Sequence, residues 1–200
     1  MGAVALVDYG AGNLQSVRNA LKAAGADNVI VTGDPDAVAT ADRVVLPGVG
    51  AFAHCMNALS AIAGMVDVLN EATGPGGKPF LGICVGMQLM AGTGEEHGVH
   101  RGLGWIPGSV RQMRPDGVKI PHMGWNDVVP TEQHPLIAPG EAYFLHSYAF
   151  EGEAALATSD HGGRFVAAIG RDNRVGVQFH PEKSQAYGLA FLARFLAWRP

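Results

Sequence analysis

The sequence has few charged residues and no strong excess of either sign. Charged side chains make up 16% of the 200 residues, and the formal net charge is −4. A basic surface that would attract nucleic acid or an anionic membrane is therefore not expected. No apolar run approaches the ~20 residues of a membrane span, and the N-terminus lacks the basic region of a signal peptide. Together these absences predict a cytoplasmic protein with no nucleic-acid or membrane partner.

Cysteine is also scarce, since Cys55 and Cys84 are the only two. In a chain with no export signal, such a pair predicts free thiols in a reducing compartment. Cys55 falls within an apolar helical pattern, which favours packing in the core. Cys84 stands in a different setting, among glycines.

Apolar residues and glycine are abundant. Hydrophobic residues account for 48% of the chain, which also contains 28 glycines. This composition predicts a folded globular protein rather than a disordered one. The length predicts a single domain over residues 1–200.

Strand-like apolar runs alternate with amphipathic helical patterns in the first half of the chain. Strands are predicted at residues 3–7, 29–31, 43–46 and 79–83, and helices at 14–24, 51–71 and 85–90. This βαβ repetition predicts an α/β fold with a flavodoxin-like, twisted, mostly parallel sheet and flanking helices. The working groups of such sheets lie at the carboxyl ends of the strands, where Gly50 and Cys84 fall.

The second half has shorter, more closely spaced strand candidates. They cover residues 105–113, 118–120, 128–129, 143–148, 154–158, 165–169 and 175–179, before a closing helix at 185–198. The spacing is too short for crossover helices, so antiparallel hairpins added to the parallel sheet are predicted.

Cys84 lies in the segment Gly82-Ile83-Cys84-Val85-Gly86, directly after an apolar run. A nucleophile between glycines at the end of a strand is the sequence form of a nucleophile elbow, in which the turn leaves no room for flanking side chains. The usual elbow is G-x-S-x-G, and here a thiol replaces the hydroxyl. A packed core cysteine is the alternative interpretation. The elbow favours a catalytic nucleophile instead.

A base for that nucleophile is available in His180-Pro181-Glu182. In an extended segment, residues two apart point the same way, so Glu182 can orient one imidazole nitrogen while the other faces a thiol. A third group with this role is typical of catalytic triads. A turn histidine at a strand end is the alternative, and the pairing with the elbow makes catalysis the better interpretation.

The segment Pro47-Gly48-Val49-Gly50 ends a predicted strand. It is either a simple turn or part of an oxyanion hole, because glycines allow backbone N–H groups to reach a developing tetrahedral oxygen. In that case the amides near Val49 and Gly50 act beside the N–H of Val85, the residue after the nucleophile.

Two other patterns are weaker. Gly10-Ala11-Gly12 resembles the start of a dinucleotide fingerprint, but Gln15 occupies the place of the third glycine. The segment 95–97 and His100 hold acidic and histidine side chains without any known ligand spacing, so a polar loop or a substrate contact is favoured over a metal site. No metal and no cofactor are predicted.

These motifs resemble those of the class I, triad-type glutamine amidotransferases. The resemblance extends to the glutaminase subunits of imidazole glycerol phosphate synthases and covers essentially the whole chain. The general resemblance rests on segments 82–88, 47–50 and 180–182, and the narrower one on segments 8–14, 16–17, 121–126, 143–148 and 183–184.

The resemblance implies that L-glutamine is hydrolysed to glutamate and ammonia through a thioester on Cys84, with His180 as base and Glu182 as its partner. It also implies substrate contacts through Gln88, Glu96, Ser147 and Tyr148. Glu95 replaces Glu96 if the loop register differs.

The resemblance further implies a heterodimer with a separate cyclase subunit of (β/α)₈ barrel fold. That subunit would use the ammonia to make imidazole glycerol phosphate and AICAR in histidine biosynthesis. Little glutaminase activity is expected without the partner's ligand, with a peptide flip near Gly48 and Val49 as the gate. The implied interface residues are Asn13, Met123, Trp125, Tyr143 and Lys183.

Two other functions are compatible with parts of the pattern. One is a glutaminase for another pathway, such as anthranilate, GMP or pyridoxal phosphate synthesis, or a related γ-glutamyl hydrolase. Segments 47–50 and 123–126 argue against it. The other is a binding subunit without activity, against which the intact Cys84, His180 and Glu182 argue.

Overall fold

A computed structural model describes residues 2–200 and contains a nine-stranded sheet in the order β2-β1-β3-β4-β13-β12-β11-β8-β9. The strands from β2 to β13 in this order pair in parallel, and the remaining neighbours pair antiparallel. The parallel part has the strand order of flavodoxin-like sheets, so the predicted fold class is confirmed. The strands are β1 (Val4–Val7), β2 (Val29–Thr32), β3 (Arg43–Leu46), β4 (Phe80–Ile83), β8 (His122–Pro130), β9 (Gly140–His146), β11 (Ala155–Asp160), β12 (Arg164–Arg171) and β13 (Arg174–Val177).

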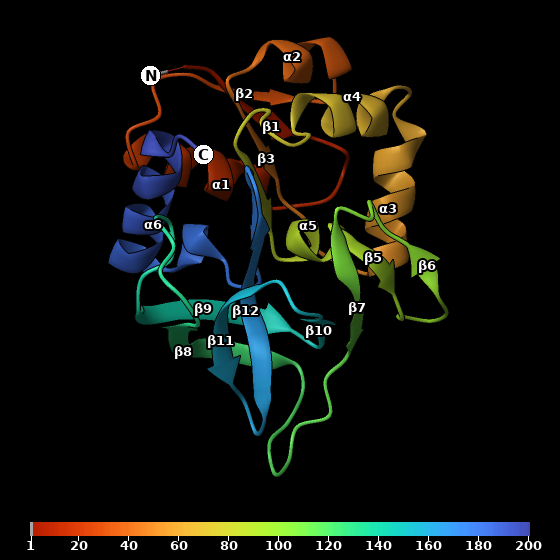
Figure 1. Cartoon of the computed structure of the whole chain (residues 1–200), viewed down its shortest axis with the longest axis vertical. Helices are drawn as coiled ribbons and strands as arrows, with labels where there is room; N and C mark the ends of the chain where they lie inside the picture. Colours follow the sequence, from red (N-terminus) through yellow and green to blue (C-terminus); the bar gives the residue numbers. More distant parts are fainter. Residues whose placement is uncertain (1) are drawn as a thin grey trace.

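Helices cover both faces of the parallel strands. Figure 1 shows α1 and α6 on one side and α3, α4 and α5 on the other, and α2 packs against α4. Strands β1, β3 and β4 are buried along their whole length, as expected for strands covered on both faces. The helices are α1 (Leu14–Ala23), α2 (Pro35–Thr40), α3 (Phe52–Ala61), α4 (Met65–Ala72), α5 (Val85–Gln88) and α6 (Gln185–Ala197).

The helix predicted at 51–71 is wrong as a single element. It is two helices, α3 and α4, because Ile62 is extended and Gly64 is left-handed, with φ of +76°. A left-handed residue cannot continue a right-handed helix, and glycine adopts that conformation without steric cost. The short helix α2 was not predicted, although Asp34 caps it and Pro35 begins it.

The second half forms the antiparallel part of the large sheet and also a separate four-stranded sheet. That sheet has the order β10-β7-β5-β6, with β5 (Ala91–Gly94), β6 (His100–Arg101), β7 (Ile106–Gln112) and β10 (Tyr148–Glu151). The prediction of one strand over 143–148 is corrected, because β9 ends at His146 and β10 begins in the other sheet. The prediction that the later strands form only hairpins is also corrected, because β13 pairs in parallel with β4.

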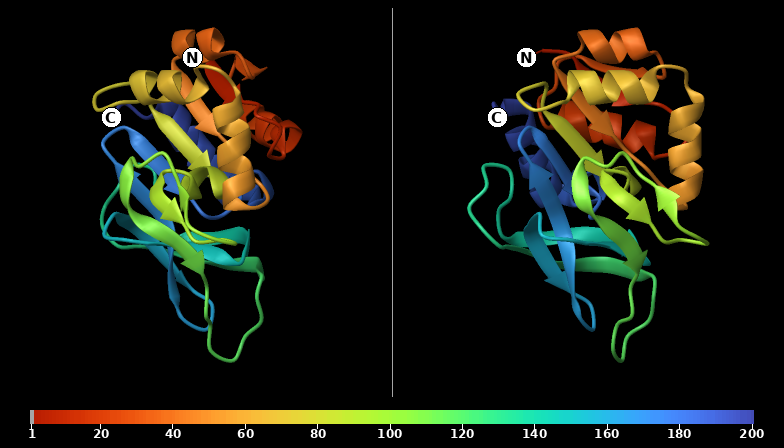
Figure 2. Two further views of the ribbon diagram at one scale, coloured as in Figure 1. Left: turned by 90° about the vertical axis from the view of Figure 1, so that its right-hand side faces the viewer. Right: turned by 45° about the vertical axis from the view of Figure 1, so that its right-hand side comes forward.

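The strand predicted at 118–120 is wrong. These residues belong to the loop between β7 and β8, where left-handed Gly117 and Pro121 leave too short a run to pair. The loop instead contacts the β11–β12 turn, since Asp116 N–H donates to the Gly162 carbonyl at 2.7 Å. Figure 2 shows both segments projecting from the end of the molecule opposite the N-terminus.

Within residues 2–200, no single helix is long and apolar enough to cross a membrane. Among the described helices, α3 and α4 reach that length when taken together, but they are bent by 95° relative to each other.

Candidate active site

Cys84 lies in a sharp turn between β4 and α5. Its φ of +53° is unusual for a residue other than glycine. Such a backbone is found at functional sites where the surrounding structure holds it in place. Here the Cys84 N–H donates to the Val177 carbonyl at 2.8 Å, which ties the turn to strand β13. The thiol therefore stands at the carboxyl end of β4, as the elbow pattern predicts.

The flanking glycines allow this turn to pack closely. A Cβ atom on Gly86 would lie 1.9 Å from the Leu46 carbonyl oxygen, and one on Gly82 would lie 2.6 Å from the Gly86 carbonyl oxygen. Both neighbours are backbone atoms of buried elements, which cannot move aside without shifting the sheet. The glycine spacing is thus a packing requirement of the turn.

We predict that Gly86→Ala destabilises the protein by roughly 3 kcal/mol, because the new methyl group clashes with backbone on β3. Denaturant unfolding of wild type and variant measures the loss. Gly92→Ala is the matched control, since its Cβ would meet only the Gly108 carbonyl, at 3.3 Å. The control is expected to change stability by about 1 kcal/mol or less. Equal stability of the two variants would show that Gly86 has room for a side chain.

His180 and Glu182 form a buried pair beside Cys84. His180 Nδ1 lies 2.8 Å from Glu182 Oε1, and the side chains are 3% and 2% exposed. The extended conformation expected here is wrong, since Pro181–Lys183 form a 3₁₀ turn and only His180 itself is extended. The contact arises because the turn folds Glu182 back toward the ring. Nδ1 therefore donates to the carboxylate, which leaves Nε2 for the thiol.

The environment of His180 favours its charged form. Burial lowers the pKa, but the hydrogen bonds and charges of Cys84 and Glu182 outweigh burial and raise the pKa from 6.5 to about 10. The backbone of His180 is fixed as well, because its N–H donates to the Tyr143 carbonyl at 2.8 Å. Its carbonyl accepts from the Ser184 hydroxyl at 2.6 Å. An imidazole held in this way can exchange a proton with the neighbouring sulfur.

A cavity of about 240 Å³ opens onto this group. Its lining brings together most of the side chains that the sequence singles out, from five separate segments of the chain. They are Val49, Gly50, Cys84, Val85, Gln88, Glu96, Ser147, Tyr148, His180 and Lys183.

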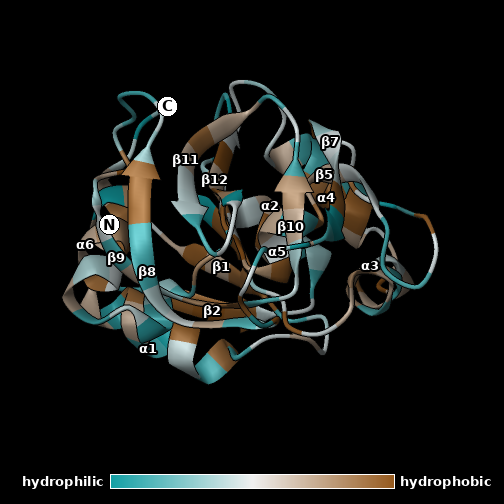
Figure 3. Cartoon of the chain, turned by 90° about the horizontal axis from the view of Figure 1, so that it is seen from below, coloured by the Kyte–Doolittle hydropathy of each residue, from teal (hydrophilic) through white to brown (hydrophobic). Residues whose placement is uncertain are grey.

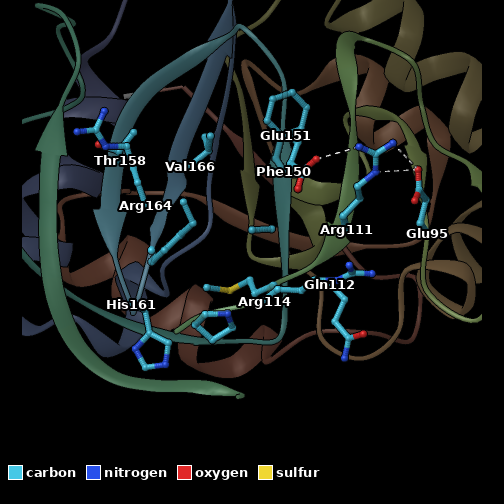
Figure 4. Close-up of a pocket in the computed structure, with 15 residues that line it drawn as sticks. Glu95, Arg111, Gln112, Arg114, Phe150, Glu151, Thr158, His161, Arg164 and Val166 are labelled. Atoms are coloured by element: carbon cyan, nitrogen blue, oxygen red, sulfur yellow. Dashed lines mark hydrogen bonds and ion pairs between the residues drawn. The ribbon is translucent and has the colours of Figure 1, made fainter. Parts of the chain in front are cut away.

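The two adjacent glutamates point to different places. Glu96 lines the cavity of Cys84, and its Oε2 accepts from the Phe52 N–H at 2.8 Å. Glu95 pairs instead with Arg111 at 3.0 Å. It lines a second, larger cavity of about 780 Å³, where Figure 4 shows Arg111 between Glu95 and Glu151. Only Glu96 is therefore placed to meet a molecule beside Cys84.

The segment 47–50 packs against the start of α5. A Cβ on Gly48 would lie 2.8 Å from the Gly86 amide nitrogen, so the two glycines allow the segments to touch. The Val49 carbonyl accepts from the buried Cys55 thiol at 3.4 Å, which places Cys55 in the core as predicted. In residues 2–200 no hydrogen bond occupies the backbone N–H groups of Val49, Gly50 or Val85. These donors remain available to an oxygen of a bound molecule.

Gln178 is a residue of this site that sequence reasoning missed. It is fully buried, and its Nε2 lies 3.7 Å from Cys84 Sγ. Its Oε1 accepts from Gln88 Nε2 at 3.0 Å, and Gln88 Nε2 also donates to the Tyr148 carbonyl at 3.1 Å. The signal was present, because Gln178 precedes His180 by two residues and extended residues two apart share a face.

The residues implied at a partner interface lie near the cavity. Met123 and Trp125 on β8 are 62% and 45% exposed. The Trp125 ring packs edge-on against Tyr143, whose ring lies 5.7 Å from Lys183 Nζ. Asn13 caps α1, which packs against the turn that carries Lys183. Seen from below in Figure 3, β8, β9 and α1 lie on one side of the molecule.

Within the described residues, no group of three or more His, Cys, Asp or Glu side chains is arranged to hold a metal ion. In the Gly10-Ala11-Gly12 loop both glycines have a positive φ, and Gly12 is also closely packed, because a Cβ there would lie 3.1 Å from Pro47.

Comparison with known proteins identifies the family. The chain matches the family described as "Glutamine amidotransferase class-I" over residues 5–197. It is 63% identical to the "Imidazole glycerol phosphate synthase subunit HisH" of Zymomonas mobilis, over 98% of this chain and 96% of that protein. It is 51% identical to the same subunit of Rhodospirillum rubrum, over 98% and 99%. A solved structure described as "Crystal structure of glutamine amidotransferase" shares the fold, with a TM-score of 0.74 at 17% identity over 97% of this chain and 99% of that one. The chain therefore belongs to the class-I glutamine amidotransferase family and, within it, to the HisH subunits of imidazole glycerol phosphate synthase.

Proposed function

We propose that this protein hydrolyses L-glutamine to glutamate and ammonia through a γ-glutamyl thioester on Cys84. The observation that carries the proposal is the buried His180–Glu182 pair, at 2.8 Å, on the cavity that also holds the Cys84 thiol. A nucleophile, a base and a group that orients the base are the three parts that acyl transfer needs.

The reaction proceeds in two halves. His180 Nε2 takes the thiol proton, and Cys84 Sγ attacks the side-chain amide carbon of glutamine. The C–N bond then breaks as His180 returns the proton to nitrogen, which releases ammonia and leaves the thioester. His180 then takes a proton from water as the water oxygen attacks the thioester carbon. The C–S bond breaks to release glutamate, and His180 returns the proton to the Cys84 sulfur. In both halves the carbonyl oxygen becomes an anion, for which the free N–H groups of Val85 and of the Val49–Gly50 segment are donors.

Substrate binding is assigned to Gln88, Glu96, Ser147 and Tyr148, which line the cavity. Glu96 is an anion at the cavity and suits the ammonium group of glutamine. Ser147 and Tyr148 offer hydroxyl and backbone groups to its carboxylate. Both amide hydrogens of Gln88 are already used within the protein, so its contribution is the remaining acceptor, Oε1.

This protein forms a heterodimer in the cytoplasm with a separate cyclase subunit of (β/α)₈ barrel fold. The ammonia is delivered to that subunit. Relatives of this chain are named as subunits of imidazole glycerol phosphate synthase, which supports such a partner. Ammonia that escaped into water would be protonated, so the acceptor site has to cover the glutaminase cavity. The exposed Met123 and Trp125 beside the Lys183–Tyr143 contact supply a surface for it.

Glutamine hydrolysis measured with and without the cyclase subunit and its ribonucleotide ligand tests this function. We expect low hydrolysis by the isolated chain and strong stimulation by the loaded partner. High hydrolysis by the isolated chain would contradict the gating, and no hydrolysis under any condition would contradict the proposed function.

Lys183→Ala tests the interface in the same assay. Lys183 is exposed, so we expect an unchanged fold and a smaller stimulation factor. Lys22→Ala, on the exposed last turn of α1, is the matched control for loss of one lysine charge. An equal stimulation factor in the two variants would remove Lys183 from the interface.

A further inference from the structure

Two buried histidines that the proposed reaction does not use stand next to the cavity. His146 Nδ1 lies 2.9 Å from the Tyr148 carbonyl oxygen, and His146 Nε2 lies 3.1 Å from His122 Nδ1. His122 Nε2 in turn lies 3.2 Å from the side-chain amide nitrogen of Asn126. The two rings are only 3% and 6% exposed, so their polar atoms depend on these protein partners.

The partners determine which nitrogen carries each hydrogen. A carbonyl can only accept, so His146 donates from Nδ1 to Tyr148 and, as a neutral ring, accepts at Nε2. His122 therefore donates from Nδ1 to His146 and accepts at Nε2 from the Asn126 amide. That amide is oriented independently, because its nitrogen also donates to the Asp160 carbonyl at 2.7 Å. Burial lowers the pKa of His122 to about 4 and is the largest cause that lowers that of His146 to about 3, so both rings are neutral.

One end of this series of hydrogen bonds is the Tyr148 carbonyl, beside the cavity. The Tyr148 carbonyl accepts from His146 and also from Gln88 Nε2, at 3.1 Å. Two N–H groups from different elements thus hold one peptide group of a residue that lines the cavity. Through Gln88 and Gln178, the same network reaches to within 3.7 Å of Cys84 Sγ. The placement of residues around the nucleophile therefore depends on where this carbonyl sits.

The other end of this series of hydrogen bonds lies on strand β8. His122 and Asn126 are four residues apart and share the inward face of the strand, whereas Met123 and Trp125 are on the exposed face. His122 is also stacked between Phe144, at 5.1 Å, and His161, at 4.2 Å between ring centroids. Figure 4 shows His161 on the wall of the larger cavity. The position of the His122 ring is thus determined by Phe144 on β9 and by His161 in the turn between β11 and β12.

We propose that His122 and His146 are positioning residues for glutamine binding. Their N–H groups donate in one direction, from His122 to His146 and from His146 to the Tyr148 carbonyl, and so hold the Ser147–Tyr148 segment in place. The inference rests on the proposed function, because it concerns glutamine at the same cavity. The decisive group is the N–H donor at Nδ1 of His122. Without it, His146 can adopt the other tautomer and release the Tyr148 carbonyl.

His122→Asn and His122→Gln separate this role from simple packing. Both substitutions remove the ring and its stacking, but asparagine places its amide nitrogen near the former Nδ1 and glutamine places it near the former Nε2. Glutamine affinity is measured by calorimetry in the complex with the cyclase subunit and its ribonucleotide ligand, where the full chain carries Cys84→Ala to prevent turnover. We expect His122→Gln to weaken binding about 3- to 10-fold, the usual effect of one hydrogen bond, and His122→Asn to restore most of that loss. Equal affinities of the two variants would overturn the inference.

The tautomers give a second readout that does not need glutamine. In ¹⁵N spectra of the wild type, we expect His146 to carry its hydrogen on Nδ1, and we expect it to keep that hydrogen in His122→Asn but not in His122→Gln. A hydrogen on His146 Nε2 in the wild type would overturn the inference even if a variant failed to fold. If the Cys84→Ala parent binds no glutamine, the proposed function fails, and these spectra still decide the role of the two histidines.

Discussion

Cys84→Ala lowers glutamine hydrolysis by roughly 10⁴-fold or more, because no other group can form the thioester. The assay measures glutamate formed by the chain together with its loaded partner. A glutamine analogue with an electrophilic side chain gives an independent readout, since it labels the nucleophile covalently and mass spectrometry locates the modified residue. We expect the label on Cys84 and none in the variant.

The other cysteine provides the matched control for this prediction. Cys55 is fully buried in α3, and its thiol donates to the Val49 carbonyl at 3.4 Å. Cys55→Ser keeps a donor for that carbonyl, so we expect hydrolysis of the same order of magnitude as wild type. Substantial hydrolysis by Cys84→Ala, or labelling of Cys55, would contradict the assignment of the nucleophile.

Glu182→Gln lowers hydrolysis by roughly 10²–10⁴-fold, a smaller loss than that of Cys84→Ala. The amide keeps the shape of the side chain, but it holds His180 in the wrong tautomer and no longer stabilises the imidazolium. Single-turnover acylation in the complex measures the loss. An equal loss in the two variants would contradict the assigned order of roles, because the nucleophile forms the covalent bond and the carboxylate acts only through the ring.

The same variant changes the titration of His180. Since Glu182 is one of the causes that raise the His180 pKa to about 10, we expect a lower pKa in Glu182→Gln, measured by NMR of the imidazole. A raised folded-state pKa gives stability that is fully present below the unfolded value of 6.5 and is lost as the pH rises from there through about 10. The free energy of unfolding of wild type should therefore fall over this window, and that of the variant should fall less. Parallel pH profiles would contradict the coupling.

Much of the fold could be predicted from sequence because its signals are local. Strands β1 and β4 are continuous apolar runs, β3 is apolar after Arg43, and α1 and α6 have clear helical periodicity, so each is visible within its own segment. The errors fall where a single backbone angle or a distant partner decides. The left-handed Gly64 divides α3 from α4, and β13 joins the parallel strands through its register with β4.

The candidate site shows the same division. The elbow around Cys84 and the His180–Glu182 pair depend on residues close in sequence, so the motifs predicted their proximity, although not the 3₁₀ turn that creates the contact. Gln178, His122 and His146 were missed as members of the site. The spacing of Gln178 to His180 could have found the first, whereas the contact between His122 and His146 joins two strands, and no spacing rule describes it.

By itself, the sequence determined the α/β class of the fold, the glycine-flanked position of Cys84 and the short spacing between His180 and Glu182. These depend on backbone sterics and on short spacings, which act within a few residues. Only the tertiary structure decided what surrounds Cys84. Parallel pairing places Val177 opposite Ile83, and this register puts Gln178 and His180 beside a thiol that lies more than ninety residues earlier. It is the pairing of strands across the whole sheet, rather than any local motif, that decides which distant side chains meet there.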